Sequence, residues 1–226
     1  MSIARELGTS IVTGQRPPGS LLPRETEIAA QFKVSRGLIR ESMRTLAAKG
    51  LVESKQKAGT KVRDRSEWQL LDPLLLAWMF ESVPPRGFVQ SLFQLRLIVE
   101  PAAAELAAVS RTTQQLSRMG HALEKMAEYG LPTAEGQRAD EEFHSIILEA
   151  TGNELLHNLA ASIAAAVRWT TFFKYRAFRQ FGDPMPSHRA IFDAIANGDA
   201  AAAREATVAL VRQAHLDTEL AMKAKP

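Results

Sequence analysis

Apolar residues recur at helical spacing in three short segments near the start of the chain. Their positions predict helices over residues 2–13, 22–32 and 35–50, with a turn of only two residues between the last two. The pattern then changes, and residues 51–62 predict two short strands joined by a tip that contains Gly59, where a tight bend is permitted. Helix, short turn, helix and hairpin, in that order, predict a winged helix-turn-helix.

From residue 72 onward the apolar pattern is helical, and no strand-like alternation follows Val62. The predicted helices cover residues 72–80, 88–109 with an interruption or kink near Pro101, 113–128, 135–150, 154–181, 187–196 and 200–222. Such helices pack as antiparallel neighbours in a bundle. We therefore predict a mainly α protein with a winged helix-turn-helix domain over residues 1–62, a polar linker over 63–71 and an all-helical domain over 72–226.

Charge is unevenly distributed along the chain. The net charge is only +3, but residues 1–65 hold 13 Lys and Arg against 6 Asp and Glu, whereas the remaining residues hold 15 against 19. A basic head on a mildly acidic body is typical of a DNA-binding domain joined to a body that does not bind DNA.

The chain has no cysteine, which excludes disulfides and cysteine-ligated zinc. No apolar run reaches the ~18 residues of a membrane span, so we expect a cytoplasmic protein without a membrane partner.

The third predicted helix carries the features of an element that reads DNA. Ser35 is a good N-cap, and three arginines follow at intervals of four residues on one face. Because a guanidinium fork can pair with both acceptors of guanine, we assign Arg36 and Arg40 to bases. We place Arg44 and Lys49 nearer phosphates. The alternative is a solvated basic face on an ordinary helix.

The predicted hairpin tip is also basic. Gln56 and Lys57 lie there and are expected to enter a minor groove or to contact phosphates. The alternative is an exposed loop that serves only solubility.

Asp140, His144 and His188 are candidate metal ligands in the predicted bundle. Asp140 and His144 are four residues apart, so their side chains share one helix face, a spacing that suits two ligands of one divalent ion. His188 opens a later helix and is the candidate third ligand. The alternative for the first two is an ion pair on a solvated helix.

Arg96 is a charged residue in an apolar stretch and needs a partner if it is buried. Glu100, one turn later, can form an ordinary ion pair with it. Alternatively, Arg96 holds the carboxylate of a small molecule through two parallel hydrogen bonds while Glu100 orients it. Arg168 and Trp169 are further candidates for the same cavity, and helix-surface packing is their alternative.

Two sets of segments resemble known families. The first set is Pro17-Pro-Gly-Ser-Leu-Leu-Pro23, Glu25, Glu27-Ile-Ala29, Val34-Ser-Arg36 and Arg40-Glu41, and it resembles the head of GntR-type bacterial regulators. The second is Arg96-Leu-Ile-Val-Glu-Pro101, Asp140-Glu-Glu-Phe-His144, Gly152-Asn153, and His188 to Ile195 with Asp199, and it resembles the FCD effector domain of the FadR-like branch. Trp68, Leu71-Asp-Pro73 and Trp78 are similar to repressors of D-galactonate use.

The resemblance implies a homodimer that binds a near-palindromic operator in double-stranded DNA and releases it when a small carboxylic acid binds the body. It implies DNA contacts at Ser35, Arg36, Arg40, Gln56 and Lys57. One arginine of the family's contact set is replaced here by Thr26, so the operator bases are expected to differ.

The resemblance also implies that Asp140, His144 and His188 are three of the four metal ligands of FCD domains, with zinc the preferred ion. The position of the fourth ligand, a histidine in the last helix, aligns with Leu210. His215 lies about 140° around an ideal helix from that position and is a poor substitute. Water or an acidic effector would complete the coordination.

We therefore expect a transcriptional repressor, not an enzyme, that a sugar acid releases from DNA. A regulator that senses a hydroxy acid, an amino acid or the metal itself is the nearest alternative. A metal-dependent hydrolase is disfavoured because no nucleophile is paired with a base. An architectural DNA-binding protein would not need the acidic body.

Overall fold

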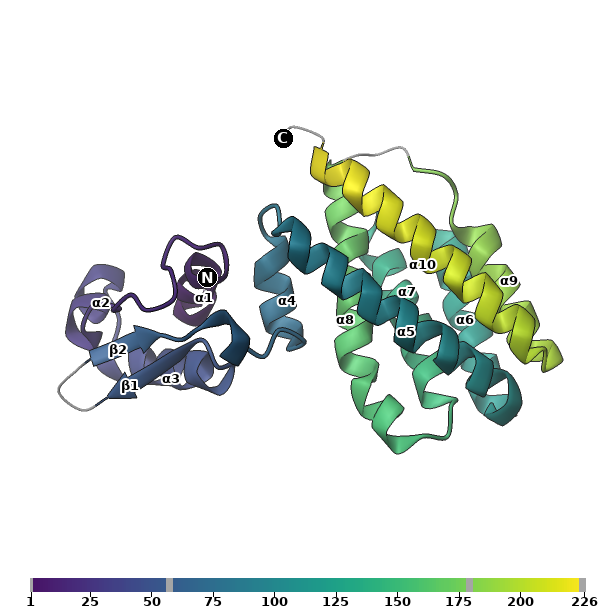
Figure 1. Cartoon of the computed structure of the whole chain (residues 1–226), viewed down its shortest axis with the longest axis horizontal. Helices are drawn as coiled ribbons and strands as arrows, with labels where there is room; N and C mark the ends of the chain where they lie inside the picture. The colour runs from purple at the N-terminus through teal and green to yellow at the C-terminus, as the bar shows by residue number, and fades with distance from the viewer. Residues whose placement is uncertain (1, 56–58, 178–180, 224–226) are drawn as a thin grey trace. The chain divides into compact units, whose positions relative to one another are not determined.

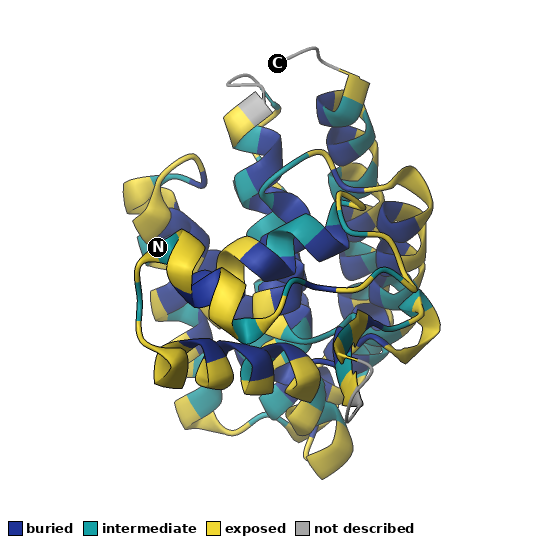
Figure 2. Cartoon of the chain, turned by 90° about the vertical axis from the view of Figure 1, so that its left-hand side faces the viewer, coloured by how far each residue is buried: buried dark blue, intermediate teal, exposed yellow. Residues whose placement is uncertain are grey.

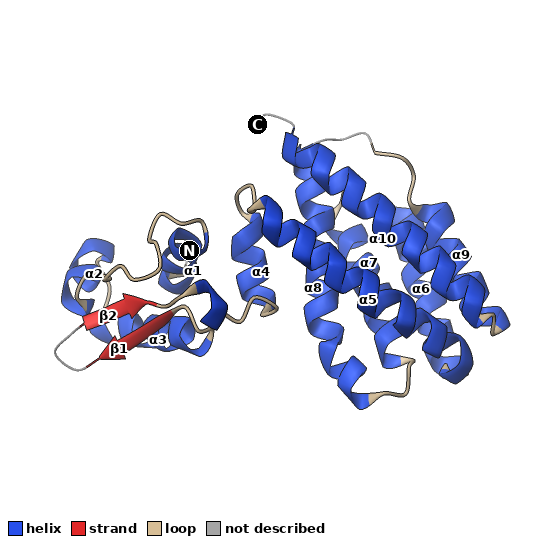
Figure 3. Cartoon of the chain, in the orientation of Figure 1, coloured by secondary structure: helices blue, strands red, loops and turns tan. Residues whose placement is uncertain are grey.

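The computed structural model describes residues 2–55, 59–177 and 181–223, and the chain divides into two compact units, Met1–Pro84 and Pro85–Pro226. The regular elements of the described residues are helices and one two-stranded sheet, joined by loops (Figure 3), which confirms the predicted mainly α class. The first unit contains α1 (Ile3–Val12), α2 (Glu25–Phe32), α3 (Arg36–Ala48), β1 (Val52–Lys55), β2 (Gly59–Val62), the 3-10 turn η1 (Arg65–Glu67) and α4 (Pro73–Phe80). The second contains α5 (Arg86–Ser110), α6 (Thr113–Tyr129), α7 (Ala134–Glu149), α8 (Glu154–Ala177), α9 (Met185–Asn197) and α10 (Ala200–Lys223).

A tight turn joins α2 to α3. Lys33 ends α2 in the left-handed conformation, with φ of 54°, and allows the chain to reverse direction. Ser35 then caps α3, because its hydroxyl accepts a hydrogen bond from the Leu38 amide at 3.3 Å. The predicted helix-turn-helix is therefore present, with the predicted cap.

The hairpin that follows α3 in the chain is antiparallel and forms the wing of the winged helix-turn-helix. β1 and β2 pair with Val52 opposite Val62 and Lys55 opposite Gly59. A segment from the loop before α2 lies along the other side of β2, since the Leu22 amide donates to the Thr60 carbonyl at 2.8 Å. The wing is therefore anchored to the rest of the unit along β2.

The segment expected to be a linker, residues 63–71, packs on the end of α3. Trp68 Nε1 donates to the Arg63 carbonyl at 3.0 Å, and the Gln69 amide donates to the Lys49 carbonyl at 3.0 Å. Asp72 caps α4 as predicted, with Pro73 at its first position. The first compact unit thus continues through α4, beyond the limit of 62 that the sequence indicated for the head.

Helix α4 packs against α1. A Cβ atom on Gly8 would lie 2.4 Å from ring carbons of Trp78, so the absence of a side chain on α1 is what lets the indole approach. Glu81, which follows α4, pairs with Arg5 at 2.6 Å and accepts from Thr9 at 3.2 Å. Apolar packing and an ion pair together fix α4 to the first helix.

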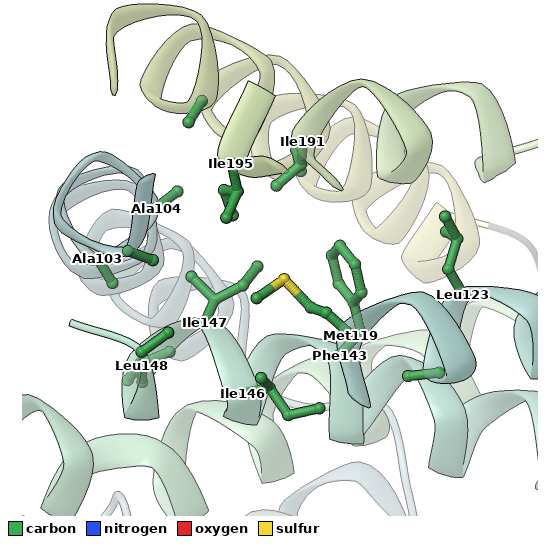
Figure 4. Packing of buried hydrophobic residues seen from close by; sticks show 14 of the residues in the cluster. Ala103, Ala104, Met119, Leu123, Phe143, Ile146, Ile147, Leu148, Ile191 and Ile195 are labelled. Atoms are coloured by element: carbon green, nitrogen blue, oxygen red, sulfur yellow. The ribbon is translucent and has the colours of Figure 1, made fainter. Parts of the chain in front are cut away.

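The second unit is a helical bundle in which α5 and α10 lie side by side (Figure 1), as do α7 and α8. Its core is built from large side chains on α6, α7 and α9 facing alanines of α5. Figure 4 shows Phe143, Met119, Ile147, Ile191 and Ile195 pointing toward one another. Most helices have a buried and an exposed face (Figure 2), as the sequence pattern predicted, whereas Ile163–Val167 of α8 are buried in succession.

Two predicted helix features differ from the structure. Helix α5 runs as one element through Pro101, so of the predicted interruption or kink the interruption is wrong. Helix α8 ends at Ala177, and Phe181, which was expected to be its last residue, is not helical. Gly182 and Pro184 follow at once, and both residue types are poor helix formers.

Candidate nucleic-acid interface and ligand cavity

Helix α3 presents a basic face to solvent. Arg36, Arg40 and Arg44 are exposed, whereas Ile39 and Met43 are buried on the opposite side. Such a face, at the second helix of a helix-turn-helix, is placed to enter a major groove. Arg44 lies 3.5 Å from Glu41, but both side chains are more than two-thirds exposed, so this pair is weak.

Lys49 does not belong to this face. It is 7% exposed, and its Nζ atom lies 2.7 Å from Asp72 Oδ1. The expectation that it lies near phosphates is therefore wrong, because the lysine stem is buried under α4 and its charge is neutralised there. Gln56 and Lys57, the predicted wing-tip contacts, lie outside the described residues.

A buried cluster of one carboxylate and two imidazoles joins α7 to α9. Asp140 Oδ1 lies 3.0 Å from His188 Nε2 and 3.5 Å from His144 Nε2, and all three residues are 2% exposed. Thr171 of α8 donates to Asp140 Oδ2 at 3.2 Å. Asp140 and His144 lie one turn apart on α7, and His188 comes from α9, 44 residues beyond His144. The three side chains thus meet as predicted.

A buried charge network continues from this cluster into α5. Arg96 Nε donates to Glu100 Oε1 at 2.6 Å, and Arg96 Nη1 donates to the Thr170 hydroxyl at 3.1 Å. Glu100 Oε2 lies 2.9 Å from His144 Nδ1. Glu100 therefore contacts both Arg96 and His144. This geometry is compatible with both predictions for Glu100, an ion pair with Arg96 and the orientation of the Arg96 guanidinium toward a ligand.

The network shifts the protonation of its members strongly. Burial by itself lowers the pKa of His144, but the neighbouring carboxylates of Glu100 and Asp140 outweigh it and raise that pKa to about 9. Burial would raise the pKa of Glu100, yet the charges of Arg96 and His144 hold it at about 2. The pKa of Asp140 is likewise lowered, since its hydrogen bonds to the two histidines overcome the cost of burial.

The cluster opens onto a cavity of about 260 Å³. Arg96, Asp140, His144 and His188 all line it, and Leu210 lines it from α10. Glu100 does not line the cavity but supports two residues that do. The sequence therefore identified one wall of a real cavity.

Three other candidate residues lie elsewhere. Arg168 is not among the residues that line the cavity; its side chain is 42% exposed and lies 3.4 Å from Glu141. Trp169 packs edge-on against Phe172. His215 stacks on Phe93 with ring centroids 4.6 Å apart, and it takes no part in the histidine cluster.

The cavity is also lined by polar residues that the sequence analysis missed. Lys174 and Thr171 of α8 line the cavity, as do Gln213 and Asp217 of α10. Lys174 stands in the apolar run Phe172-Phe173-Lys174-Tyr175, so it shows the same signal, a charge in an apolar helix, that drew attention to Arg96.

The donor set fits a divalent metal. Asp140, His144 and His188 offer one carboxylate oxygen and two imidazole nitrogens that lie within 4.8 Å of one another. Each imidazole directs Nε2 toward Asp140, and its Nδ1 atom faces a second partner. His144 Nδ1 lies 2.9 Å from Glu100 Oε2, and His188 Nδ1 lies 2.9 Å from the Pro184 carbonyl oxygen. Such outer partners fix the ring orientation of metal-bound histidines. Three protein ligands with a free position suit zinc.

The two units match two known domain families. Residues 1–62 match the bacterial regulatory proteins of the gntR family, and residues 91–213 match the FCD domain. The chain belongs to the GntR family of transcriptional regulators, in the branch with an FCD domain. This GntR-type regulator therefore carries its DNA-binding domain in the first unit and the cavity in the second.

Characterised relatives span nearly the whole regulator. The galactonate operon transcriptional repressor of Escherichia coli K12 is 33% identical over 91% of this chain and 90% of its own length. The transcriptional regulator LutR of Bacillus subtilis is 31% identical over 88% and 91%. The solved structure of Lar, which controls the agr system of Listeria monocytogenes, shares the fold with a TM-score of 0.68 at 18% identity, covering 96% of this chain and 94% of Lar. Within the described residues, no helix has the length and apolarity needed to cross a membrane.

Proposed function

We propose that this regulator is a repressor that leaves its operator when a small carboxylic acid, of the sugar-acid class, binds the cavity of the second unit. The observation that carries the proposal is the buried wall formed by Arg96, Asp140, His144 and His188. It combines a cation with hydrogen-bonding groups on buried side chains, which suits an anion that also bears hydroxyls. The 33% identity to a galactonate operon repressor supports the same class.

Arg96 is the proposed carboxylate-binding residue. Glu100 and Thr170 occupy only two of its five N–H donors, at Nε and Nη1, so further donors are free to meet an anion in the cavity. Because Glu100 fixes the guanidinium, little side-chain entropy is lost on binding. Zinc held by Asp140, His144 and His188 would supply a Lewis-acidic position for the acid's oxygens.

The DNA contacts are proposed for the basic face of α3. Arg36 and Arg40 would pair with bases, Ser35 and Arg44 with phosphates, and the wing-tip residues Gln56 and Lys57 with the adjacent groove or backbone. The exposed positions of the three arginines support this assignment.

A homodimer is proposed as the active form, since a two-fold operator needs two heads. Helix α5 carries an exposed apolar stripe, with Ile98 and Val109 each 71% exposed and Leu106 42% exposed. Such a stripe is costly on a monomer and supports self-association.

A thermal-shift experiment tests the effector proposal. The metal-stripped regulator and the zinc-loaded regulator are each heated with D-galactonate, D-gluconate, D-galacturonate, L-lactate and glycine. A true effector at ~100-fold excess over its Kd should stabilise the protein by about 2.7 kcal/mol. The proposal predicts a shift with a sugar acid that disappears in Arg96→Met. If only glycine or L-lactate gives a shift, the effector is an amino acid or a hydroxy acid and not a sugar acid. If zinc gives a shift and no acid adds to it, the metal itself is the signal.

A further inference from the structure

A second polar cluster lines the cavity on the side of α8 and α10. Lys174 is 5% exposed, and its Nζ atom lies 3.7 Å from Asp217 Oδ2. Gln213 holds the other carboxylate oxygen by donating to Asp217 Oδ1 at 2.8 Å. All three residues line the cavity, and the mechanism proposed above uses none of them. A buried ion pair is costly to maintain, so its position on a cavity wall calls for an explanation.

The helices place Lys174 one turn along α8 from Thr170 and Thr171, which contact Arg96 and Asp140. Thr171 contacts Asp140, and Lys174 follows it by nearly one turn of α8, or ~4.5 Å along the axis. Helix α10 lines the cavity from Leu210 to Asp217, about two turns, or ~10 Å. An acid whose carboxylate meets Arg96 would therefore have Lys174 and Asp217 within reach of its remaining groups.

The separation of the two charges indicates which group of the acid binds there. A direct N–H···O bond is 2.7–3.2 Å long, so at 3.7 Å Lys174 Nζ and Asp217 Oδ2 form an ion pair that leaves both groups able to accept a third polar group from the cavity that they line. A hydroxyl group satisfies both at once, because it accepts from the ammonium and donates to the carboxylate. A second carboxylate satisfies only one of them, and it would set two anions against a single ammonium.

We propose that Lys174 and Asp217 together recognise a hydroxyl group at the distal end of the effector, with Gln213 positioning Asp217. The pair thereby selects polyhydroxy monoacids over deoxy acids of the same length and over diacids. This inference rests on the proposed binding of a carboxylic acid in the cavity and names the part of the acid that decides specificity.

The test measures dissociation constants of the zinc-loaded, full-length regulator by calorimetry. The probes are D-galactonate and D-gluconate, 2-hydroxyhexanoate, which lacks the distal hydroxyls, and galactarate, which has a second carboxylate. Lys174→Met and Asp217→Leu each remove one partner. Lys174→Met/Asp217→Leu removes the pair without leaving an unpaired charge, which protects folding. Arg212→Met, an exposed cation on α10 that does not line the cavity, is the matched control.

Wild type should bind the better of the two aldonates about ten- to a hundredfold more tightly than 2-hydroxyhexanoate, as expected for a hydrogen bond to charged groups. All three pair variants should lose most of this preference while still binding 2-hydroxyhexanoate, and Arg212→Met should keep it. If the variants keep the preference, or if galactarate binds most tightly in a manner that needs Lys174, the hydroxyl assignment is overturned while the effector proposal stands. If no acid binds wild type, the effector proposal itself fails.

Discussion

Lys49 at the end of α3 and Asp72 at the start of α4 form an ion pair in which Nζ lies 2.7 and 2.8 Å from the two carboxylate oxygens. Asp72 Oδ1 also accepts from the Leu74 and Leu75 amides, so one carboxylate caps α4 and holds the buried lysine. Helix α3 is thereby fixed to the last helix of its own unit.

Asp72→Ala should destabilise the first unit by about 3 kcal/mol, because it leaves the Lys49 charge buried without a partner and removes the cap of α4. Urea unfolding followed by tryptophan fluorescence measures the loss. The double variant Lys49→Met/Asp72→Ser keeps a capping hydroxyl and removes the charge, so it should be clearly more stable than Asp72→Ala. Equal loss in both would show that the ion pair is not what matters.

Gly8→Ala should destabilise the same unit by about 1–3 kcal/mol, since the new methyl group would meet the Trp78 ring at 2.4 Å. Gly87 of α5 is the matched control, because a Cβ atom there meets nothing within 4 Å. Gly87→Ala should be neutral or stabilise by about 0.4–1 kcal/mol. Thermal unfolding of the two variants beside wild type decides the matter, and a harmless Gly8→Ala would contradict the close contact.

The metal-free regulator should lose stability as the pH rises from about 6.5 to 9. The pKa of His144 is raised from 6.5 in the unfolded chain to about 9 in the fold, so the folded state binds this proton more tightly. The stabilisation is complete below pH 6.5 and is lost as the pH passes through 9. Chemical unfolding at several pH values measures the slope, which His144→Gln should reduce. An unchanged slope in that variant would assign it to other groups.

Zinc binding should release a proton near pH 7.5, because a metal-bound imidazole must be neutral whereas His144 is protonated in the free cluster. The apparent affinity for zinc should therefore rise between pH 7 and 9. Calorimetry in buffers of different ionisation enthalpy counts the protons released. A binding heat independent of the buffer would be inconsistent with a protonated His144.

Arg40→Ala should reduce discrimination between the operator and mutated operators by about 1–3 kcal/mol at the base that it contacts. Arg44→Ala should instead weaken binding uniformly and lower the salt dependence by about one counterion. Fluorescence anisotropy with a DNA site selected from a random pool distinguishes the two effects. If Arg40→Ala behaves like Arg44→Ala, the assignment of Arg40 to bases fails.

Local sequence signals predicted the features that depend on local spacing. The cap at Ser35, the single face shared by Asp140 and His144, and the cap at Asp72 all arise within a few residues. His188 was named from its place at the start of a later helix, and the family resemblance supported its meeting with Asp140, which no local spacing rule could have predicted.

Partners distant in sequence were not predictable in this way. Lys49 follows a basic helix face and was assigned to phosphates, yet its partner Asp72 lies 23 residues away. Arg168 is next to Val167, which lines the cavity, but one residue turns an α-helix by about 100° and carries the arginine out of it. Lys174 and Asp217 come from different helices, and only their packing reveals the pair.

The contact between Gly8 and Trp78 has a practical consequence for biosensor construction. A chimera that joins this head to a foreign sensory body is naturally cut where the family match of the head ends, at residue 62. That cut would remove α4 and, with it, the Trp78 ring that packs against Gly8 of α1. It would also remove Asp72, the ion-pair partner of Lys49. A transplantable reading head should instead be cut at the pair of prolines, Pro84 and Pro85, where the two compact units meet in sequence.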